Sequence, residues 1–361
     1  MGQSEYDVAR LTVRLGAIQE NYRTCARLAG HAAAAGVVKA DGYGLGALQS
    51  TRALLAAGCD TFFVARLEEG IAIRPVAPKS RIFVLDGARA ESVPALVAHN
   101  LTPVLNSLDE IALWSAGARG RDAAIHFDTG LSRLGLPPSE LAILAAETGQ
   151  RLAGINLVLV MSHLACAEDP ASPMNREQLS RFRAGLAQLP PAPASFASSG
   201  GIFLGEDYAF DMVRPGIALY GGNPQAGKAM AVAARLTGRV LQLRRVDKGE
   251  SVGYGATFRV ERPMRLATVA LGYADGLLRA LGNRGAGAIG GRKAPIVGRV
   301  SMDLMTLDVT DIPALAPGAE IELLGDTILL DDVAAAAGTA AYEVLTRLGG
   351  GRVARVYEGT P

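Results

Sequence analysis

The chain has 361 residues, a formal net charge of +1, four histidines, three cysteines and one tryptophan. A nearly balanced charge provides no basic field, so the composition argues against nucleic-acid binding and against docking on an anionic membrane. The length suggests about two domains, each large enough to bury its own core, and we expect the partner to be a small molecule.

The first sixteen residues, MGQSEYDVARLTVRLG, contain acidic residues and lack the continuous apolar core of a signal peptide. No stretch of the sequence approaches the roughly 18 uncharged apolar residues of a transmembrane helix. Cys25, Cys59 and Cys166 are scattered without a CxxC spacing, which argues against a disulfide framework and against a zinc cluster. We therefore expect a cytoplasmic protein without a metal site.

Residues 37–222 repeat one pattern: a short apolar strand, a polar or glycine-rich turn, and an Ala/Leu-rich amphipathic stretch. Such repeats are typical of βα units. The predicted strands begin near Val37, Phe62, Ile82, Thr102, Ala124, Leu157, Ala194 and Met212. Eight strands at this spacing favour a (β/α)8 TIM-like barrel over residues 10–228, although an open doubly wound sheet would give the same local pattern.

The pattern changes after about residue 230, where short β-branched runs are separated by glycine and proline turns. These runs predict a mainly β domain over residues 229–361, with one late helix around Asp331–Arg347. A strand at residues 4–9 is expected to join this β domain, because it precedes the first barrel unit.

The segment VVKADGYGLG, residues 37–46, places Lys39 within the first predicted barrel strand. Burial disfavours the charged form of lysine, so such a lysine is usually present for chemistry. The glycines around Tyr43 allow the backbone to approach a ligand at the end of the barrel where active sites form. The segment indicates either a Schiff-base lysine with an anion-binding tyrosine, or a strand-end lysine in solvent beside an ordinary glycine turn.

Further segments follow in a fixed order: HFDTGLSRLGL, MSHLACAEDP, VRPGIALYG, VGYGATF, LGYADG and VSMDLMTLDV. Together with VVKADGYGLG they resemble the motifs of the alanine racemases, from about Tyr6 to Tyr357. Ordered motifs make coincidence very improbable, whereas any one of them alone would be weak. The resemblance implies pyridoxal 5'-phosphate as cofactor, the barrel and β domain of fold type III, and a homodimer whose active sites take residues from both subunits.

The resemblance implies two catalytic residues. Lys39 would hold the cofactor and act as the base on one face of the substrate α-carbon, and Tyr254 of the other subunit would act on the opposite face. Racemisation needs this pairing, because a proton must leave one face and return to the other. Without the resemblance, Tyr254 would be interpreted as a surface aromatic in a glycine-flanked turn.

The remaining site residues also come from the resemblance. Arg133 would contact the tyrosine and the cofactor phenolate, Arg214 would face the pyridine nitrogen and leave it unprotonated, and His163 would couple to Arg214. Tyr43, Ser199, Gly216 and Ile217 would bind the phosphate. Gly351 stands where some members carry a further phosphate-binding tyrosine, so that contact is expected to be missing or replaced by backbone. Met302, Asp303 and Tyr273 would line the substrate pocket and its entrance.

One position departs from the family pattern. Many members carry a carbamylated lysine two residues before the DTG aspartate, where this chain has His126. Histidine cannot form that carbamate, so Arg133 must be positioned by the imidazole, by Asp128 or by a bound anion such as chloride.

The resemblance thus predicts an alanine racemase that supplies D-alanine for peptidoglycan. The alternatives are a broad-specificity, serine or lysine racemase, an amino-acid decarboxylase of the same fold group, and a non-catalytic pyridoxal phosphate carrier. Carriers end after the barrel, so the β domain that contains Tyr254 argues against the last of these.

Overall fold

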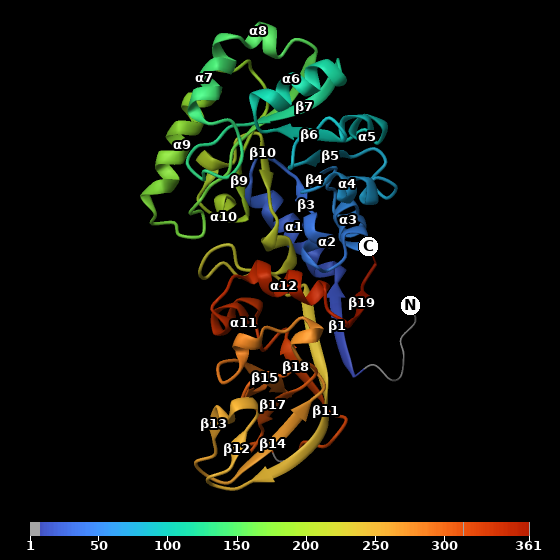
Figure 1. Cartoon of the computed structure of the whole chain (residues 1–361), viewed down its shortest axis with the longest axis vertical. Coiled ribbons are helices and arrows are strands. Elements are labelled where there is room, and N and C mark those ends of the chain that lie inside the picture. Colours follow the sequence, from blue (N-terminus) through green and yellow to red (C-terminus); the bar gives the residue numbers. More distant parts are fainter. Residues whose placement is uncertain (1–7, 313, 361) are drawn as a thin grey trace.

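A computed structural model of the protein describes residues 8–312 and 314–360. Figure 1 shows two stacked parts, a ring of strands covered by helices and, below it, a smaller unit built mainly from strands. The first and last described strands, blue β1 and red β19, lie together beside the joint between the two parts.

The upper part is a nearly closed parallel barrel. Its strand order is β2-β10-β9-β8-β7-β6-β5-β4-β3. Only Ala35 separates β2 from β3, so the first strand pairs with β10 through one half and with β4 through the other. The bounds are β2 Ala33–Ala34, β3 Gly36–Val37, β4 Thr61–Val64, β5 Arg81–Val84, β6 Thr102–Leu105, β7 Arg121–His126, β8 Ile155–Met161, β9 Ala194–Ser198 and β10 Met212–Arg214. Each predicted barrel strand is confirmed, and this closure rules out the open sheet.

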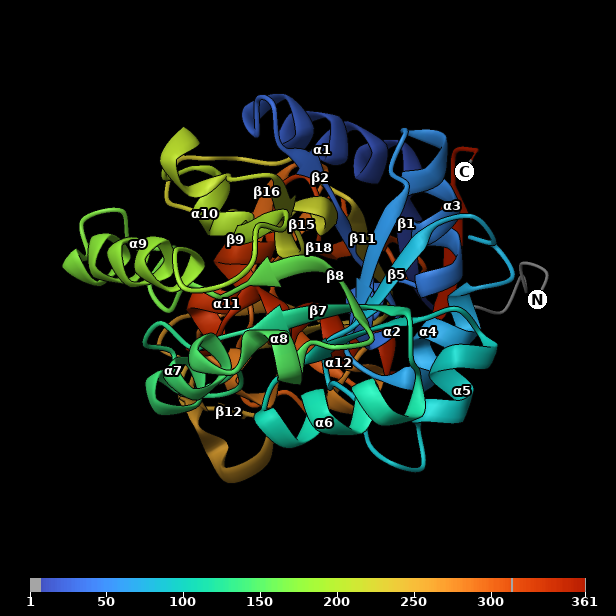
Figure 2. The same ribbon diagram turned by 90° about the horizontal axis from the view of Figure 1, so that it is seen from above.

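Helices surround the barrel on its outside (Figure 2). Their bounds are α1 Leu15–Leu28, α3 Ala47–Ala56, α4 Leu67–Ile73, α5 Val93–Ala98, α6 Leu108–Gly117, α7 Pro138–Ala146, α8 Thr148–Arg151, α9 Pro173–Leu186 and α10 Ser199–Ile202. Ser107 shows how the sequence begins such a helix: its side chain accepts a hydrogen bond from the Glu110 N–H, which satisfies one free donor of α6. Every helix in the described ranges is too short or too polar to cross a lipid bilayer.

The lower part is a mixed sheet with a hairpin. Its strands are β1 Ala9–Arg14, β11 Ala234–Val246, β14 Met264–Val269, β15 Ala286–Ile289, β16 Arg292–Pro295, β17 Met305–Asp308, β18 Glu320–Leu324 and β19 Ala354–Glu358, and the hairpin is β12 Ser251–Val252 with β13 Phe258–Arg259. The strand β1 lies between β11 and β19, antiparallel to the first and parallel to the second. The predicted β domain is therefore present. Most of the strand expected at residues 4–9 falls outside the described residues.

The late helix is where the prediction was wrong. Instead of one helix over Asp331–Arg347, the structure has α11 Leu330–Ala337 and α12 Ala341–Gly349. Gly338 ends α11 with a left-handed φ of 69°, a conformation that glycine adopts without steric cost. This break lets α12 turn toward the barrel, where it contacts the segment that follows Lys39 (α2, Lys39–Tyr43).

Candidate active site

A cavity of about 600 Å³ opens at the carboxyl ends of the barrel strands. Residues far apart in the sequence meet there because parallel strands all end at the same rim of a barrel. From the sequence-predicted site, the lining includes Lys39, Tyr43, Arg133, His163, Ser199, Arg214, Gly216 and Ile217. His126, the position that departs from the family pattern, also lines it. The structure thus brings the predicted barrel residues together around one space.

Lys39 stands two positions after the last residue of β3, with Val38 between them, and is half-buried at the cavity wall. Burial lowers the pKa of its amine, and the nearby Arg133 guanidinium lowers it further. A lowered pKa raises the fraction of neutral, nucleophilic amine at neutral pH, which is the form that reacts with a carbonyl. The environment of Lys39 therefore suits covalent chemistry, and the interpretation of a lysine in free solvent does not fit it.

Arg214 is a buried cation that is bound by neutral acceptors. Its guanidinium donates to the Ser195 hydroxyl at 2.5 Å, to the Ser162 carbonyl at 2.7 Å and to His163 Nδ1 at 3.3 Å. Because arginine can only donate, His163 Nδ1 must accept, so the proton of this imidazole sits on Nε2. Burial lowers the pKa of His163 well below its ordinary value, and the Arg214 charge acts in the same direction. His163 is therefore a neutral group beside a permanent cation.

A polar, glycine-lined corner occupies one side of the cavity. The Ser199 hydroxyl accepts hydrogen bonds from the Gly216 N–H at 2.9 Å and the Ala218 N–H at 3.2 Å. The Tyr43 hydroxyl lies 2.1 Å from the place that a Cβ on Gly216 would take, so only glycine allows this approach. A hydroxyl pair beside backbone N–H groups at the start of a helical turn is a typical arrangement for an anion.

Tyr342 is a cavity residue that the sequence analysis missed. It is the second residue of α12 and lines the cavity, and its ring centroid lies 6.0 Å from that of Tyr43. Burial and the Glu168 carboxylate raise the pKa of its hydroxyl, which is therefore a protonated donor at neutral pH. Gly351 led to the expectation that the contact of a further phosphate-binding tyrosine is missing or replaced by backbone, and Tyr342 reaches this corner from α12, which precedes Gly351. The AAYEVL sequence, with small residues before a tyrosine, was the available signal.

His126 is held in one tautomer by Asn106. The Asn106 amide nitrogen donates to the Leu85 and Val104 carbonyls, so its oxygen must accept from His126 Nδ1 at 2.8 Å. Nε2 then carries a lone pair and can accept a hydrogen bond at the cavity wall. Burial lowers the pKa of His126 to about 4, with the Arg214 charge as the next cause.

Asp128 has a different task. Its Oδ1 accepts from the backbone N–H groups of Gly130, Leu131 and Ser132 at 3.0, 3.0 and 3.1 Å. The carboxylate thus fixes the turn that leads into Arg133 and is already occupied. Of the groups considered for positioning the Arg133 side chain, the geometry disfavours Asp128 as a direct partner.

The pKa of His126 predicts a pH dependence of stability. Its folded pKa of about 4 lies below the ordinary 6.5, so the unfolded chain binds more protons in this interval and the folded state loses stability as pH falls through it. His126 alone should lower the free energy of unfolding by about 2 kcal/mol between pH 7 and pH 5. We expect the melting temperature of His126→Gln to depend less steeply on pH in this range. The exposed His31 supplies the control, since His31→Gln should keep the wild-type slope, and equal slopes for all three proteins would contradict the prediction.

The other predicted site residues lie in the β domain. Tyr254, Tyr273 and Met302 line a separate hollow of about 220 Å³ together with Arg279, Arg299, Val300 and Ser301. Tyr254 is 73% exposed and Met302 is 54% exposed, which is unusual for large side chains of a globular domain. Asp303 points into an ion pair with Arg352 at 2.6 Å. Within one chain, the structure therefore gathers the predicted residues into two groups, one in the barrel and one in the β domain.

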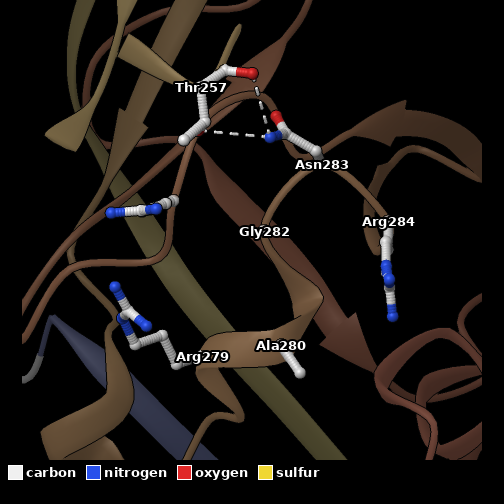
Figure 3. A pocket seen from close by; sticks show the side chains of 7 residues that line it. Thr257, Arg279, Ala280, Gly282, Asn283 and Arg284 are labelled. Carbon is white, nitrogen blue, oxygen red and sulfur yellow. Dashed lines mark hydrogen bonds between the residues drawn. The ribbon is translucent and has the colours of Figure 1, made fainter. Parts of the chain in front are cut away.

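A second hollow of about 330 Å³ adjoins the Tyr254 hollow, because both are lined by Arg279 and Arg299. Figure 3 shows the turn that carries Gly282, with Asn283 donating to Thr257 and the Arg279 and Arg284 side chains reaching out nearby. These arginines were not predicted from the sequence. Together they give the exposed face around Tyr254 a positive charge, which suits a carboxylate ligand.

Comparisons with known proteins agree with this geometry. Residues 13–224 match the family described as "Alanine racemase, N-terminal domain" and residues 233–357 match "Alanine racemase, C-terminal domain". The chain is 48% identical to an alanine racemase of Rhodospirillum rubrum, with 99% of this chain and 98% of the relative covered, and 49% identical to a catabolic alanine racemase of Agrobacterium fabrum, with 94% and 89% covered. The structure superposes with a TM-score of 0.92 on the alanine racemase of Bartonella henselae with covalently bound pyridoxal phosphate, at 40% identity over 97% of this chain and 99% of that one.

Proposed function

This chain belongs to the alanine racemase family, and we infer that it interconverts L-alanine and D-alanine with pyridoxal 5'-phosphate as cofactor. The observation that carries this function is the single cavity whose wall carries Lys39, the polar corner of Tyr43 and Ser199, and the buried Arg214. The two family matches cover both domains, which favours a racemase over a carrier built on the barrel alone.

The residues present fit the cofactor. The phosphate would bind in the corner where the Tyr43 hydroxyl lies against Gly216, at the position that a Cβ would take. Ser199, Ile217 and Tyr342 line the cavity beside it. Lys39 would form the covalent bond to the cofactor aldehyde through Nζ. His163 and Arg214 would meet the pyridine ring, and a cation there leaves the ring nitrogen unprotonated. When bound, the cofactor supplies an electron sink that stabilises negative charge at the substrate α-carbon.

We propose that Lys39 and Tyr254 move the proton. One removes it at Nζ on one face of the α-carbon and the other delivers it from the phenol oxygen on the opposite face, which inverts the configuration. Arg133 would bind the substrate side of the cofactor, and the His126 Nε2 lone pair is the acceptor that would orient its guanidinium. An anion would be repelled by that lone pair, so we favour the imidazole over chloride.

Tyr254 would reach the cavity from a second copy of the chain. Tyr254 stands in the turn between β12 and β13, a hairpin that Figure 1 places at the end of the β domain away from the barrel. The exposed Tyr254 and Met302 side chains, with Tyr273 and Asp303, would then complete the partner's substrate pocket and entrance. We therefore propose a homodimer with shared active sites.

The test is the formation of D-alanine from L-alanine with added cofactor, measured at several protein concentrations. We expect the activity per mole of protein to fall on dilution, because a separated subunit lacks one of its two bases. Racemisation with unchanged specific activity down to the monomeric state, checked by analytical ultracentrifugation, would contradict the shared site but not the activity. Absence of any D-alanine would contradict the function itself.

We also propose a role and a location. D-alanine would be supplied for peptidoglycan in the cytoplasm, and the free thiols Cys25, Cys59 and Cys166 fit a reducing compartment. The opposite use would be a catabolic one, in the degradation of D-alanine, and one relative is named as a catabolic alanine racemase. A deletion strain that requires D-alanine for growth would support the biosynthetic role, and one that only fails to grow on D-alanine would support the catabolic role.

A further inference from the structure

The five residues after Lys39 form an uncommon turn. Ala40, Asp41, Gly42, Tyr43 and Gly44 have φ values of 53°, 53°, 62°, 56° and 84°. Left-handed backbone is costly for residues with a Cβ, so three of these positions are strained. We call residues 40–44 the Lys39 turn. It carries Tyr43 and directly follows Lys39, and both side chains line the cavity.

The barrel supplies part of what holds this turn. Gly42 N–H donates to the Val38 carbonyl at 2.9 Å, and Gly44 N–H donates to the Ala40 carbonyl at 2.8 Å. Ala40 N–H donates to the Glu69 carboxylate at 2.6 Å. These bonds satisfy the backbone, but a strained conformation persists only where further contacts exclude its alternatives.

The β domain supplies those contacts through Arg355 on β19. Its Nη1 donates to the Asp41 carboxylate at 2.5 Å and to the Gly44 carbonyl at 3.2 Å. The other Asp41 oxygen accepts from the Ala47 N–H at 2.8 Å, at the start of α3. Arg355 thus binds the second and the last residue of the left-handed stretch, and Asp41 connects the stretch to the following helix.

Close packing leaves the turn little room to relax. A Cβ on Gly349, at the end of α12, would lie 2.2 Å from the Gly44 Cα, so the two backbones are in direct contact. The Tyr357 hydroxyl fills the place of a Gly46 Cβ at 2.1 Å. Both contacts come from the same segment as Arg355, so residues from Gly349 to Tyr357 form the outer wall of the Lys39 turn.

We propose that Arg355 is a positioning residue, which holds the Lys39 turn from the β domain so that Lys39 and Tyr43 are presented together to the cofactor. The proposal rests on the proposed function in one respect, the assignment of Lys39 as the cofactor lysine. Arg355 is absent from the cavity lining and touches no reacting atom. Its effect is preorganisation: without it, cofactor binding must also order the turn.

A matched control is present in the same domain. Arg14, at the end of β1, pairs with Asp326 at 2.7 Å, and the side chains of this pair are 31% and 57% exposed. Arg355 and Asp41 are 31% and 52% exposed. Loss of either arginine removes a comparable ion pair, but only Arg355 contacts the Lys39 turn.

The experiment compares Arg355→Ala, Arg355→Lys and Arg14→Ala with the wild-type holoenzyme. We expect Arg355→Ala to raise the cofactor dissociation constant about tenfold, with faster amide exchange in the peptide that spans residues 38–47 and an unchanged KM for alanine. Arg355→Lys should recover part of the affinity through a single donor to Asp41. Arg14→Ala should change the cofactor dissociation constant less than twofold.

Two outcomes would overturn the proposal. One is an unchanged cofactor dissociation constant and unchanged amide exchange at residues 38–47 in Arg355→Ala. The other is that Arg14→Ala loses as much cofactor affinity and as much melting temperature as Arg355→Ala. Arg355 would then act only by stabilising the fold as a whole. Neither the cofactor dissociation constant nor the amide exchange depends on turnover. A wild-type protein that binds the cofactor without racemising alanine would therefore contradict the proposed function, and the role of Arg355 could still be tested.

Discussion

Lys39→Ala should lose the visible absorbance of the bound cofactor and should lower the rate of racemisation by at least about three orders of magnitude. The substitution removes the amine that would bond to the cofactor and that would act as one of the two bases. Burial and the Arg133 charge lower the pKa of the Lys39 amine, which favours its neutral, reactive form. Alanine has no amine and cannot react at this position. One measurement is the absorbance spectrum after incubation with the cofactor and removal of the unbound excess by dialysis. The other is the rate of D-alanine formation.

The control for this prediction is Lys79→Ala. Lys79 is exposed on the barrel between α4 and β5, so its loss should leave both the spectrum and the rate unchanged. A second control is the melting temperature, since a half-buried cation at a cavity wall adds little to packing. Retention of the cofactor band in Lys39→Ala would show that another lysine holds the cofactor.

Tyr254→Phe should keep the cofactor and lose racemisation by about two to four orders of magnitude. The phenol oxygen is removed while the ring remains, and Tyr254 is 73% exposed, so packing and stability should not change. Because Lys39 still serves one face, α-proton exchange with solvent should persist for one enantiomer of alanine and fail for the other. Proton NMR in heavy water, with each enantiomer supplied separately, measures both rates. Exchange at the wild-type rate for both enantiomers would refute the two-base model.

The same variants test the shared site. If Lys39 and Tyr254 of different subunits meet, a hybrid of one Lys39→Ala and one Tyr254→Phe chain contains one doubly altered site and one intact site. Random reassociation makes half of the dimers hybrid, so the mixture should reach about one quarter of wild-type activity although each variant alone is inactive. No recovery after subunit exchange would place both bases in the same chain.

Sequence patterns predicted the barrel strands because each buried strand is a short apolar run between a helical stretch and a turn, a purely local signal. The late helix was misjudged for the converse reason. Asp331–Arg347 has continuous helix-forming composition, and the single Gly338 that ends α11 is tolerated inside many helices. That one residue redirects α12, which is why Tyr342 reaches the cavity from a segment in which no ligand contact was predicted.

The sequence by itself determined the residue types of the site and their order along the chain, since ordered motifs identify a family whatever the distances between them. Only the tertiary structure decided what each group can do. It fixed the His126 tautomer through Asn106 and occupied Asp128 with backbone N–H groups. It also left Tyr254 exposed in a hollow apart from Lys39. The protonation state, the tautomer and the possible contacts of a side chain depend on neighbours that folding brings together. The order of residues along the sequence does not show which of them become neighbours.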